Sequence, residues 1–437
     1  MEQQSNKPII SIGVLFFIFG FITWVCSVLI PYLQLACELN NFQAQLVSFA
    51  FYISYFVMAL PGGWILKYTG FKKGISLGLF IMMCGSLLFI PGALYRTYPF
   101  FLAGLFVQGA GLAILQTAAN PYVTVLGPAE SAARRMSIMG ICNGFAGILA
   151  PYILGKIVLD DADAVKTQVE ALGTMEKEAA LNALASKVML PYGIIAAALL
   201  LLSIWFYKIS LPEPEEEKAE ENAASAQPDR KSVLQYPQLL LGVVTLFLYV
   251  GVEVIAGNTI ISYGAWTGIA LNTAKFFSSF TLFCMLIGYI IGIICIPRYC
   301  SQVQALTVSA VLGIIFSLAA IHTTGVVSVV FIALLGLANS LMWPSIWPLA
   351  ITGLGRHTKT GSALLIMAIA GGALVPLLYG RLSDVFDPKL AYWIVVPCYI
   401  AIGLYALFSR ARLKKIKSIA GQTGADHKEV SVALKPE

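Results

Sequence analysis

LPEPEEEKAEENAASAQPDRK, residues 211–231, is the most polar stretch of this chain. Its glutamates and prolines cannot bury enough apolar surface to form a core, so the stretch predicts a solvated linker. On either side of it, short clusters of charge alternate with apolar runs of roughly 20 residues, the length that spans a bilayer core as a helix. Six such runs precede the linker and six follow it. The sequence therefore predicts an all-α membrane protein with twelve transmembrane helices in two six-helix halves.

The twelve apolar runs also set the expected boundaries of the parts. The predicted spans are about 9–33, 44–66, 75–95, 98–120, 137–159, 188–208, 238–262, 274–296, 303–322, 326–350, 361–381 and 391–409. We expect an N-terminal six-helix half over residues 1–208, a cytoplasmic linker over 209–236, a C-terminal six-helix half over 237–410 and a cytoplasmic tail over 411–437. The charged segment 160–187, between spans five and six, predicts an external helix.

The composition is typical of a membrane protein. Of 437 residues, 58% are hydrophobic and only 11% are charged, whereas soluble domains carry about 25% charged residues. The formal charge of +6 does not indicate nucleic-acid binding, because the basic residues lie in short loops and a tail. They are more frequent on the side of the termini, which predicts that both termini are cytoplasmic. The polar arm Met1–Pro8 and the run after it lack a cleavage site, so we expect no cleaved signal peptide.

Patterns of catalytic chemistry are missing from the sequence. The three histidines, His322, His357 and His427, are scattered, and no HExxH, GxSxG or Walker pattern occurs. We therefore expect no enzyme activity, no catalytic residue, no metal centre and no cofactor. Most of the eight cysteines lie inside apolar runs, where we expect them to pack as small apolar side chains rather than form disulfides.

Polar side chains inside apolar runs are costly and are therefore candidates for function. Glu253 is the most conspicuous of them, because it lies inside span seven between Gly251 and Gly257. A transport role is the hypothesis we favour, and a carboxylate paired with a cation on a neighbouring helix is the structural alternative. Asn258, five positions further on, lies on a different face of an ideal helix.

A second group of candidates is rich in amides. Gln116 and Asn120 are four residues apart and share a helix face, and Asn143 lies in span five. Amides both donate and accept hydrogen bonds, as a neutral polyhydroxylated ligand requires, although amides also join helices to one another in membranes. In span ten, Trp343 and Trp347 share a face, where an indole plane could lie against a sugar ring, although packing is the commoner role of a tryptophan.

Two long motifs, one in each half, carry a family resemblance. QTAANPYVTVLGP, residues 116–128, and WPSIWP, residues 343–348, resemble signatures of the fucose/glucose/galactose permease family within the major facilitator superfamily. FYISYF, residues 51–56, matches the second span of that family. The resemblance covers nearly the whole chain. It implies the major facilitator fold, a monomer in the bacterial inner membrane, and secondary active import of a sugar by alternating access.

The resemblance also implies roles for single residues. Asn143 matches the asparagine that contacts sugar in span five, and Glu253 matches an acidic residue that recurs in the glucose/galactose branch. Ser27 and Gln116 stand where the proton-coupled fucose symporters carry acids. Because both acids are absent, the fucose-type proton relay cannot be carried over. Glu253 is left as the main candidate for coupling, with a sodium ion or a proton as the coupling ion.

The resulting hypothesis is a permease for a hexose of the glucose or galactose type, coupled to a cation through Glu253. The expected substrate-binding residues are Gln116, Asn120, Asn143, Trp343 and Asn258. A proton-coupled permease for N-acetylglucosamine or fucose is the first alternative, and uniport is not excluded. A sugar sensor on a transporter scaffold is disfavoured, because the tail after Arg410 has no room for a signalling domain.

Overall fold

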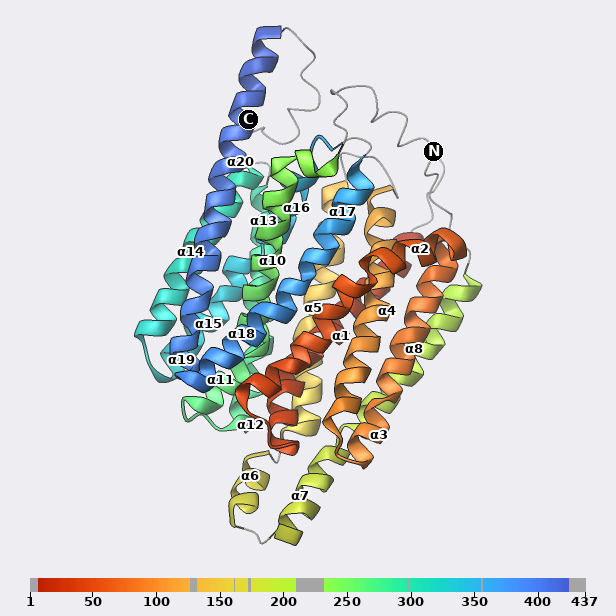
Figure 1. The fold of residues 1–437 in the computed structure, drawn as a ribbon, viewed down its shortest axis with the longest axis vertical. Coiled ribbons are helices and arrows are strands. Elements are labelled where there is room, and N and C mark those ends of the chain that lie inside the picture. Colours follow the sequence, from red (N-terminus) through yellow and green to blue (C-terminus); the bar gives the residue numbers. More distant parts are fainter. Residues whose placement is uncertain are drawn as a thin grey trace.

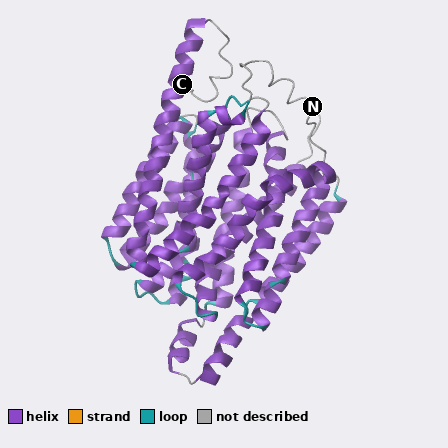
Figure 2. Cartoon of the chain, in the orientation of Figure 1, coloured by secondary structure: helices purple, strands orange, loops and turns teal. Residues whose placement is uncertain are grey.

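The computed structural model describes residues 7–125, 132–160, 162–171, 174–209, 232–296, 299–354 and 357–423. This part of the chain is helical almost throughout, and it contains no strand (Figure 2). Twelve of its helical segments are long and apolar enough to cross a membrane. The predicted all-α architecture of twelve spans is confirmed.

The described residues before the linker form eight helices. They are α1 (Lys7–Ala36), α2 (Asn41–Leu87), α3 (Phe89–Leu94), α4 (Tyr98–Val125), α5 (Ala132–Val158), α6 (Ala162–Ala171), α7 (Thr174–Ser186) and α8 (Met189–Lys208). Within this half α2 packs along α4 and α8, and α1 packs along α5. The charged segment before α8 therefore forms two short helices, α6 and α7, where the sequence predicted one.

The second half follows a short 3₁₀ turn, η2 (Val233–Gln235). Its helices are α10 (Pro237–Asn258), α11 (Ile260–Trp266), α12 (Leu271–Ala274), α13 (Phe277–Cys295), α14 (Gln302–His322), α15 (Gly325–Asn339), α16 (Met342–Ile351), α17 (Thr358–Met367), α18 (Gly371–Val385), α19 (Pro388–Ala391) and α20 (Val395–Thr423), with 3₁₀ turns η4 (Ala368–Ala370) and η5 (Tyr392–Ile394). Most of the predicted linker, 209–236, lies outside the described residues. The boundaries of the two halves and of the tail stay predictions, although α20 continues as helix into the predicted tail.

Several spans are interrupted. The long α2 contains two spans joined at Gly70, whose φ of 73° is in the left-handed region that glycine adopts without steric penalty. Span seven breaks at Thr259 between α10 and α11, and span ten breaks at Ser340 and Leu341 between α15 and α16. Span eleven contains the 3₁₀ turn η4. Such interruptions in a membrane helix are tolerated where surrounding protein satisfies the freed backbone groups.

The two ends of the bundle differ (Figure 1). Helices α6, α7 and α12 lie at one end, which we call the α7 end, and the start of α1 and the end of α20 lie at the other, which we call the terminus end. Helix α20 projects beyond the bundle at the terminus end. The eight cysteines are free thiols, and three of them, Cys26, Cys284 and Cys398, are buried.

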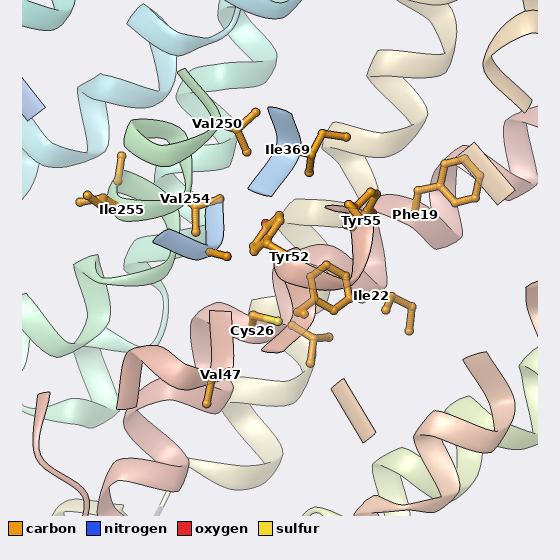
Figure 3. Packing of buried hydrophobic residues seen from close by; sticks show 14 of the residues in the cluster. Phe19, Ile22, Cys26, Val47, Tyr52, Tyr55, Val250, Val254, Ile255 and Ile369 are labelled. Atoms are coloured by element: carbon orange, nitrogen blue, oxygen red, sulfur yellow. The ribbon is translucent and has the colours of Figure 1, made fainter. Parts of the chain in front are cut away.

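One apolar core runs through both halves. Buried residues of α1 and α2, among them Phe19, Cys26 and Tyr52, belong to the same cluster as Val254 and Ile369 of the second half (Figure 3). Small residues allow this close approach, since protein interiors leave few voids. A methyl group placed on Gly257 of α10 would lie 2.2 Å from the ring of Trp24 on α1, so the two halves touch directly at this point.

Among the described residues, the hydrogen bonds between the halves lie in the part of the bundle nearest the α7 end. Asn258 Nδ2 donates to Ser48 Oγ over 3.2 Å, and Ser279 Oγ donates to the carbonyl of Ile148 over 2.8 Å. The buried ammonium of Lys275 pairs with the carboxylate of Asp160. The hydrogen bond and the positive charge of Lys275 lower the pKa of the Asp160 carboxyl from its usual value. The structure is therefore closed at the α7 end.

Glycine contacts within a half make a specific prediction about stability. A methyl group on Gly371 would lie 1.8 Å from the carbonyl oxygen of Phe247, so a Gly371→Ala change must push α18 away from α10. We expect a loss of about 1–3 kcal/mol, typical of overpacking, seen as a lower midpoint of thermal unfolding in detergent. Gly193→Ala on α8 is the matched control, because its methyl group would meet no atom within 4 Å. Equal midpoints for the two variants would contradict the packing argument.

Candidate functional site

A carboxylate and a phenol form a hydrogen-bonded pair inside the second half. Glu253 and Tyr249 lie four residues apart on α10 and therefore share a helix face. Tyr249 Oη donates to Glu253 Oε1 over 2.7 Å, and the Glu253 residue is half-buried. Hydrogen bonds to an ionised acceptor are roughly twice as strong as neutral ones. Tyr249 thus fixes the carboxylate in place on its own helix.

Two stacked tryptophans on α16 adjoin this pair. The rings of Trp343 and Trp347 lie 5.4 Å apart with planes inclined by 22°, which confirms the shared face expected from their spacing. The ring of Tyr249 lies 6.4 Å from that of Trp343. Both tryptophans are half-buried. The structure therefore brings Glu253 and Trp343 together, with Tyr249 between them.

Further phenols lie near Glu253 on other helices. Tyr289 on α13, Tyr399 on α20 and Tyr52 on α2 lie within electrostatic range of its carboxylate. Tyr399 Oη donates to Asn339 Oδ1 over 2.8 Å. Because Tyr52 belongs to the first half, the surroundings of Glu253 include both halves of the protein.

Gln116 connects to the same region through tyrosines. Its Nε2 donates to Tyr55 Oη over 3.2 Å, and the ring of Tyr55 stacks on that of Tyr52 at 6.4 Å. A methyl group on Gly372 of α18 would lie within 3.0 Å of both Tyr52 and Val254, so Tyr52 packs against α10 and α18 (Figure 3). Side-chain contacts thus connect Gln116 through Tyr55 to Tyr52, which lies within electrostatic range of Glu253.

The other predicted residues lie in different settings. Asn143 is half-buried on α5, where a methyl group on Gly20 of α1 would lie 2.0 Å from its carbonyl oxygen. Its side chain forms no hydrogen bond to another residue that the structure describes. Asn120 lies in α4, but its side chain falls outside the described part of the chain. The shared face of Gln116 and Asn120 therefore stays a prediction.

Asn258 is fully buried between the halves. Its amide nitrogen reaches Ser48, while its Oδ1 has no hydrogen-bond partner in the described part of the chain. In this closed arrangement it contacts the opposite half, and its side chain is not open to solvent. Its predicted role in substrate binding remains untested.

Three tyrosines of this region, Tyr52, Tyr55 and Tyr249, are absent from the set predicted from sequence. A signal for them existed, because Tyr52 and Tyr55 are three residues apart and Tyr249 precedes Glu253 by four, and both spacings place side chains on one helix face. Tyrosine is common in membrane proteins as an interfacial residue, so spacing alone could not single them out.

The chemistry available here is that of polar recognition. Amide and phenol groups can donate and accept hydrogen bonds, indole faces can cover an apolar ring surface, and one carboxylate can carry a charge or a proton. The described residues contain no group of three or more His, Cys, Asp or Glu side chains that could hold a metal ion.

Comparison with known proteins identifies the family. The sequence profile of the Major Facilitator Superfamily matches residues 12–376. The chain is 36% identical to the glucose/galactose transporter of Brucella abortus biovar 1 over 93% of its length and 96% of that protein. It is 31% identical to the L-fucose-proton symporter of Escherichia coli K12 over 93% of its length and 94% of that protein.

Solved structures agree with this assignment. The crystal structure of the transporter FucP in its outward conformation superposes with a TM-score of 0.70, at 29% identity, over 93% of this chain and 99% of that one. These relatives are transporters, which agrees with the expectation that the chain is not an enzyme. The chain is a multi-pass membrane protein of the major facilitator superfamily and belongs, within it, to the fucose/glucose/galactose permease family.

Proposed function

We propose that this protein imports a hexose of the glucose or galactose type by alternating access, coupled to a cation through Glu253. The observation that carries the proposal is the carboxylate held by Tyr249 beside the Trp343–Trp347 stack. A relative of 36% identity is named a glucose/galactose transporter, which supports this class of substrate. Fucose and N-acetylglucosamine are the alternative substrates, since another relative is named an L-fucose-proton symporter.

The sugar is bound by groups from both halves. Gln116, Asn120 and Asn143 supply donors and acceptors for hydroxyl groups from the first half. Trp343 supplies a flat apolar surface for the ring from the second half. Asn258 joins the site when the α7 end opens, because its contact with Ser48 must then break. A site formed between the halves is typical of transporters built from repeats.

Glu253 carries the coupling charge. Ser27, whose hydroxyl donates to the carbonyl of Trp24 over 2.7 Å, and Gln116 provide no acid in the first half. A proton is the favoured coupling ion, because the described neighbours of Glu253 are phenols and indoles rather than a shell of carboxylate and carbonyl oxygens. In such surroundings an ionised carboxylate is costly, and protonation removes its charge. Sodium is the alternative ion.

The orientation follows from the basic residues. Lysines and arginines favour the terminus end, so both termini are cytoplasmic and the α7 end faces the outside of a bacterial inner membrane. The structure then corresponds to a state closed to the outside. The interruptions at Thr259, Ser340 and η4 lie in spans seven, ten and eleven, where they can serve as hinges between access states. A monomer is sufficient for this cycle, because both halves belong to one chain.

The substrate and the ion are tested by transport into proteoliposomes. We expect purified protein to accumulate labelled glucose or galactose when a proton gradient is imposed, and to accumulate less of both under a sodium gradient alone. Accumulation of fucose or N-acetylglucosamine in preference would move the assignment to an alternative substrate. If no hexose or amino sugar enters under either gradient, the proposal is wrong.

Removing the charge at Glu253 tests whether this residue couples ion movement to sugar transport without affecting sugar binding. We expect Glu253→Gln to abolish accumulation against a gradient while retaining exchange of labelled for unlabelled sugar, because exchange needs no net ion movement. Tyr249→Phe should weaken accumulation in part, since it removes one hydrogen bond to the carboxylate. Glu176→Gln on α7 is a control for the loss of a carboxylate. Full accumulation by the Glu253 variant would remove this residue from coupling.

Variants of two glutamines on α4 distinguish a residue that binds sugar from one that only packs within the protein. We expect Gln116→Leu to raise the KM for sugar by about three- to tenfold, the worth of one neutral hydrogen bond. Gln108→Leu is the matched control, because Gln108 is buried and donates to Ser86 within the same half over 2.6 Å. It should lower thermal stability without changing KM. Equal KM values in both variants would place Gln116 outside the binding site.

A further inference from the structure

At the α7 end, each half places a carboxylate on the first backbone N–H groups of a span in the other half. Asp384, at the end of α18, accepts hydrogen bonds from the N–H groups of Asn41 and Phe42 over 3.0 and 2.8 Å. Asp163, in α6, accepts hydrogen bonds from the N–H groups of Leu271 and Asn272, both over 2.9 Å. The two arrangements are reciprocal, because one aspartate comes from each half.

The two contacts are related by the repeat of six spans. Asp384 ends span eleven and caps span two, while Asp163 follows span five and caps the turn that opens span eight, so each member of one contact lies six spans from its counterpart. The sequence around them repeats as well: Pro151, Gly155 and Lys156 have the same spacing as Pro376, Gly380 and Arg381.

Both glycines of this repeat also lie at the interface between the halves. A methyl group on Gly155 would lie 3.3 Å from Lys275 Cβ, and one on Gly380 would lie 2.7 Å from Gln45 Cγ. Each half therefore places a glycine at the interface and a carboxylate further along the chain, four residues after Gly380 on the same helix and eight residues after Gly155, in the helix that follows.

A third tie lies beside Asp163. The ammonium of Lys275 is buried and pairs with Asp160, in the segment that links α5 to α6. Helix α7, further along the chain, is fixed to the first half, since Tyr32 Oη donates to the carbonyls of Leu184 and Ala185 over 2.9 and 2.8 Å. Helix α7 is thus anchored on the first half, while Asp160 and Asp163, which precede it, contact the second half.

We propose that Asp163, Asp384 and the Asp160–Lys275 pair form a clasp that holds the α7 end closed and thereby sets the balance between the two access states. These aspartates are positioning residues, because they contact backbone N–H groups and a lysine rather than the sugar. They affect transport only by changing how often the α7 end is open. The clasp rests on the proposed alternating access, with the α7 end outside.

The clasp is built to open without unfolding its helices. Asn40 accepts a hydrogen bond from the N–H of Gln43 over 2.7 Å, so α2 keeps a cap of its own when Asp384 leaves. Asp384 is exposed, and water can therefore replace it on the N–H groups of Asn41 and Phe42. Ties of this kind are weak individually and are screened by salt, which suits a closed state that must open in every cycle.

Hydrogen–deuterium exchange in detergent or nanodiscs tests the clasp without any sugar. We expect Asp163→Ala/Asp384→Ala to raise exchange along the buried contact between the halves, at residues 44–50 and 252–262, as well as at the capped N–H groups. Glu178→Gln is the matched control, since Glu178 faces Arg96 at 4.0 Å within the first half. If exchange becomes faster only at residues 41–44 and 271–274, the aspartates merely cap these helix ends and do not hold the halves together. That result would overturn the proposal.

Transport kinetics provide the second readout. If the double variant spends more time open at the α7 end, its apparent KM for external sugar should fall by about threefold or more, because apparent affinity scales with the population of the competent state. Asp384→Asn, which keeps one acceptor oxygen, should shift KM less and covers the case in which the double variant fails to fold. An unchanged KM in a folded variant counts against the clasp. Failure of any sugar to be transported would refute the proposed substrate and leave the exchange result to decide on the clasp.

Discussion

A polypeptide in a bilayer core has no water to satisfy its N–H and C=O groups, and each unsatisfied group there costs several kcal/mol. The architecture follows from that constraint, because a helix satisfies its own backbone. Where a helix breaks, side chains take over. At Thr259, between α10 and α11, the hydroxyl adds a second hydrogen bond, over 2.8 Å, to the Ile255 carbonyl that already accepts the Thr259 N–H, and it lies 2.8 Å from Tyr392 Oη. At Ser340 the hydroxyl donates to the carbonyl of Leu337 over 2.8 Å.

The same lack of water shapes the site. Glu253 can persist in α10 only with partners at hand, and Tyr249 supplies one from the preceding turn. Small residues then bring the other half close: Gly257 admits the ring of Trp24, and Gly372 admits that of Tyr52. Without these glycines the first half could not reach the surroundings of Glu253. The hydrogen bond to Glu253 and the close packing at these glycines therefore both follow from the lack of water inside the protein.

Much of this arrangement could be predicted from the sequence. Runs of apolar residues locate spans because length and hydropathy are local properties, and the stacking of Trp343 on Trp347 follows from a spacing of four. The partners of Glu253 and Asn258 could not be predicted in the same way. Tyr52 and Ser48 reach them from α2, some two hundred residues earlier in the chain, and contacts between halves depend on packing rather than on local pattern. Most of the linker and the side chain of Asn120 lie outside the described residues, so those predictions stay as they were.

The length of helix α20 is useful for single-molecule measurements of the distance between the two halves. It runs without interruption from Val395 to Thr423 and leaves the bundle at the same end as the start of α1, yet α1 packs in the first half and α20 in the second (Figure 1). A dye attached near the start of α1 and a second dye near the end of α20 would therefore report on different halves. The distance between the two labels would then change as one half rotates against the other.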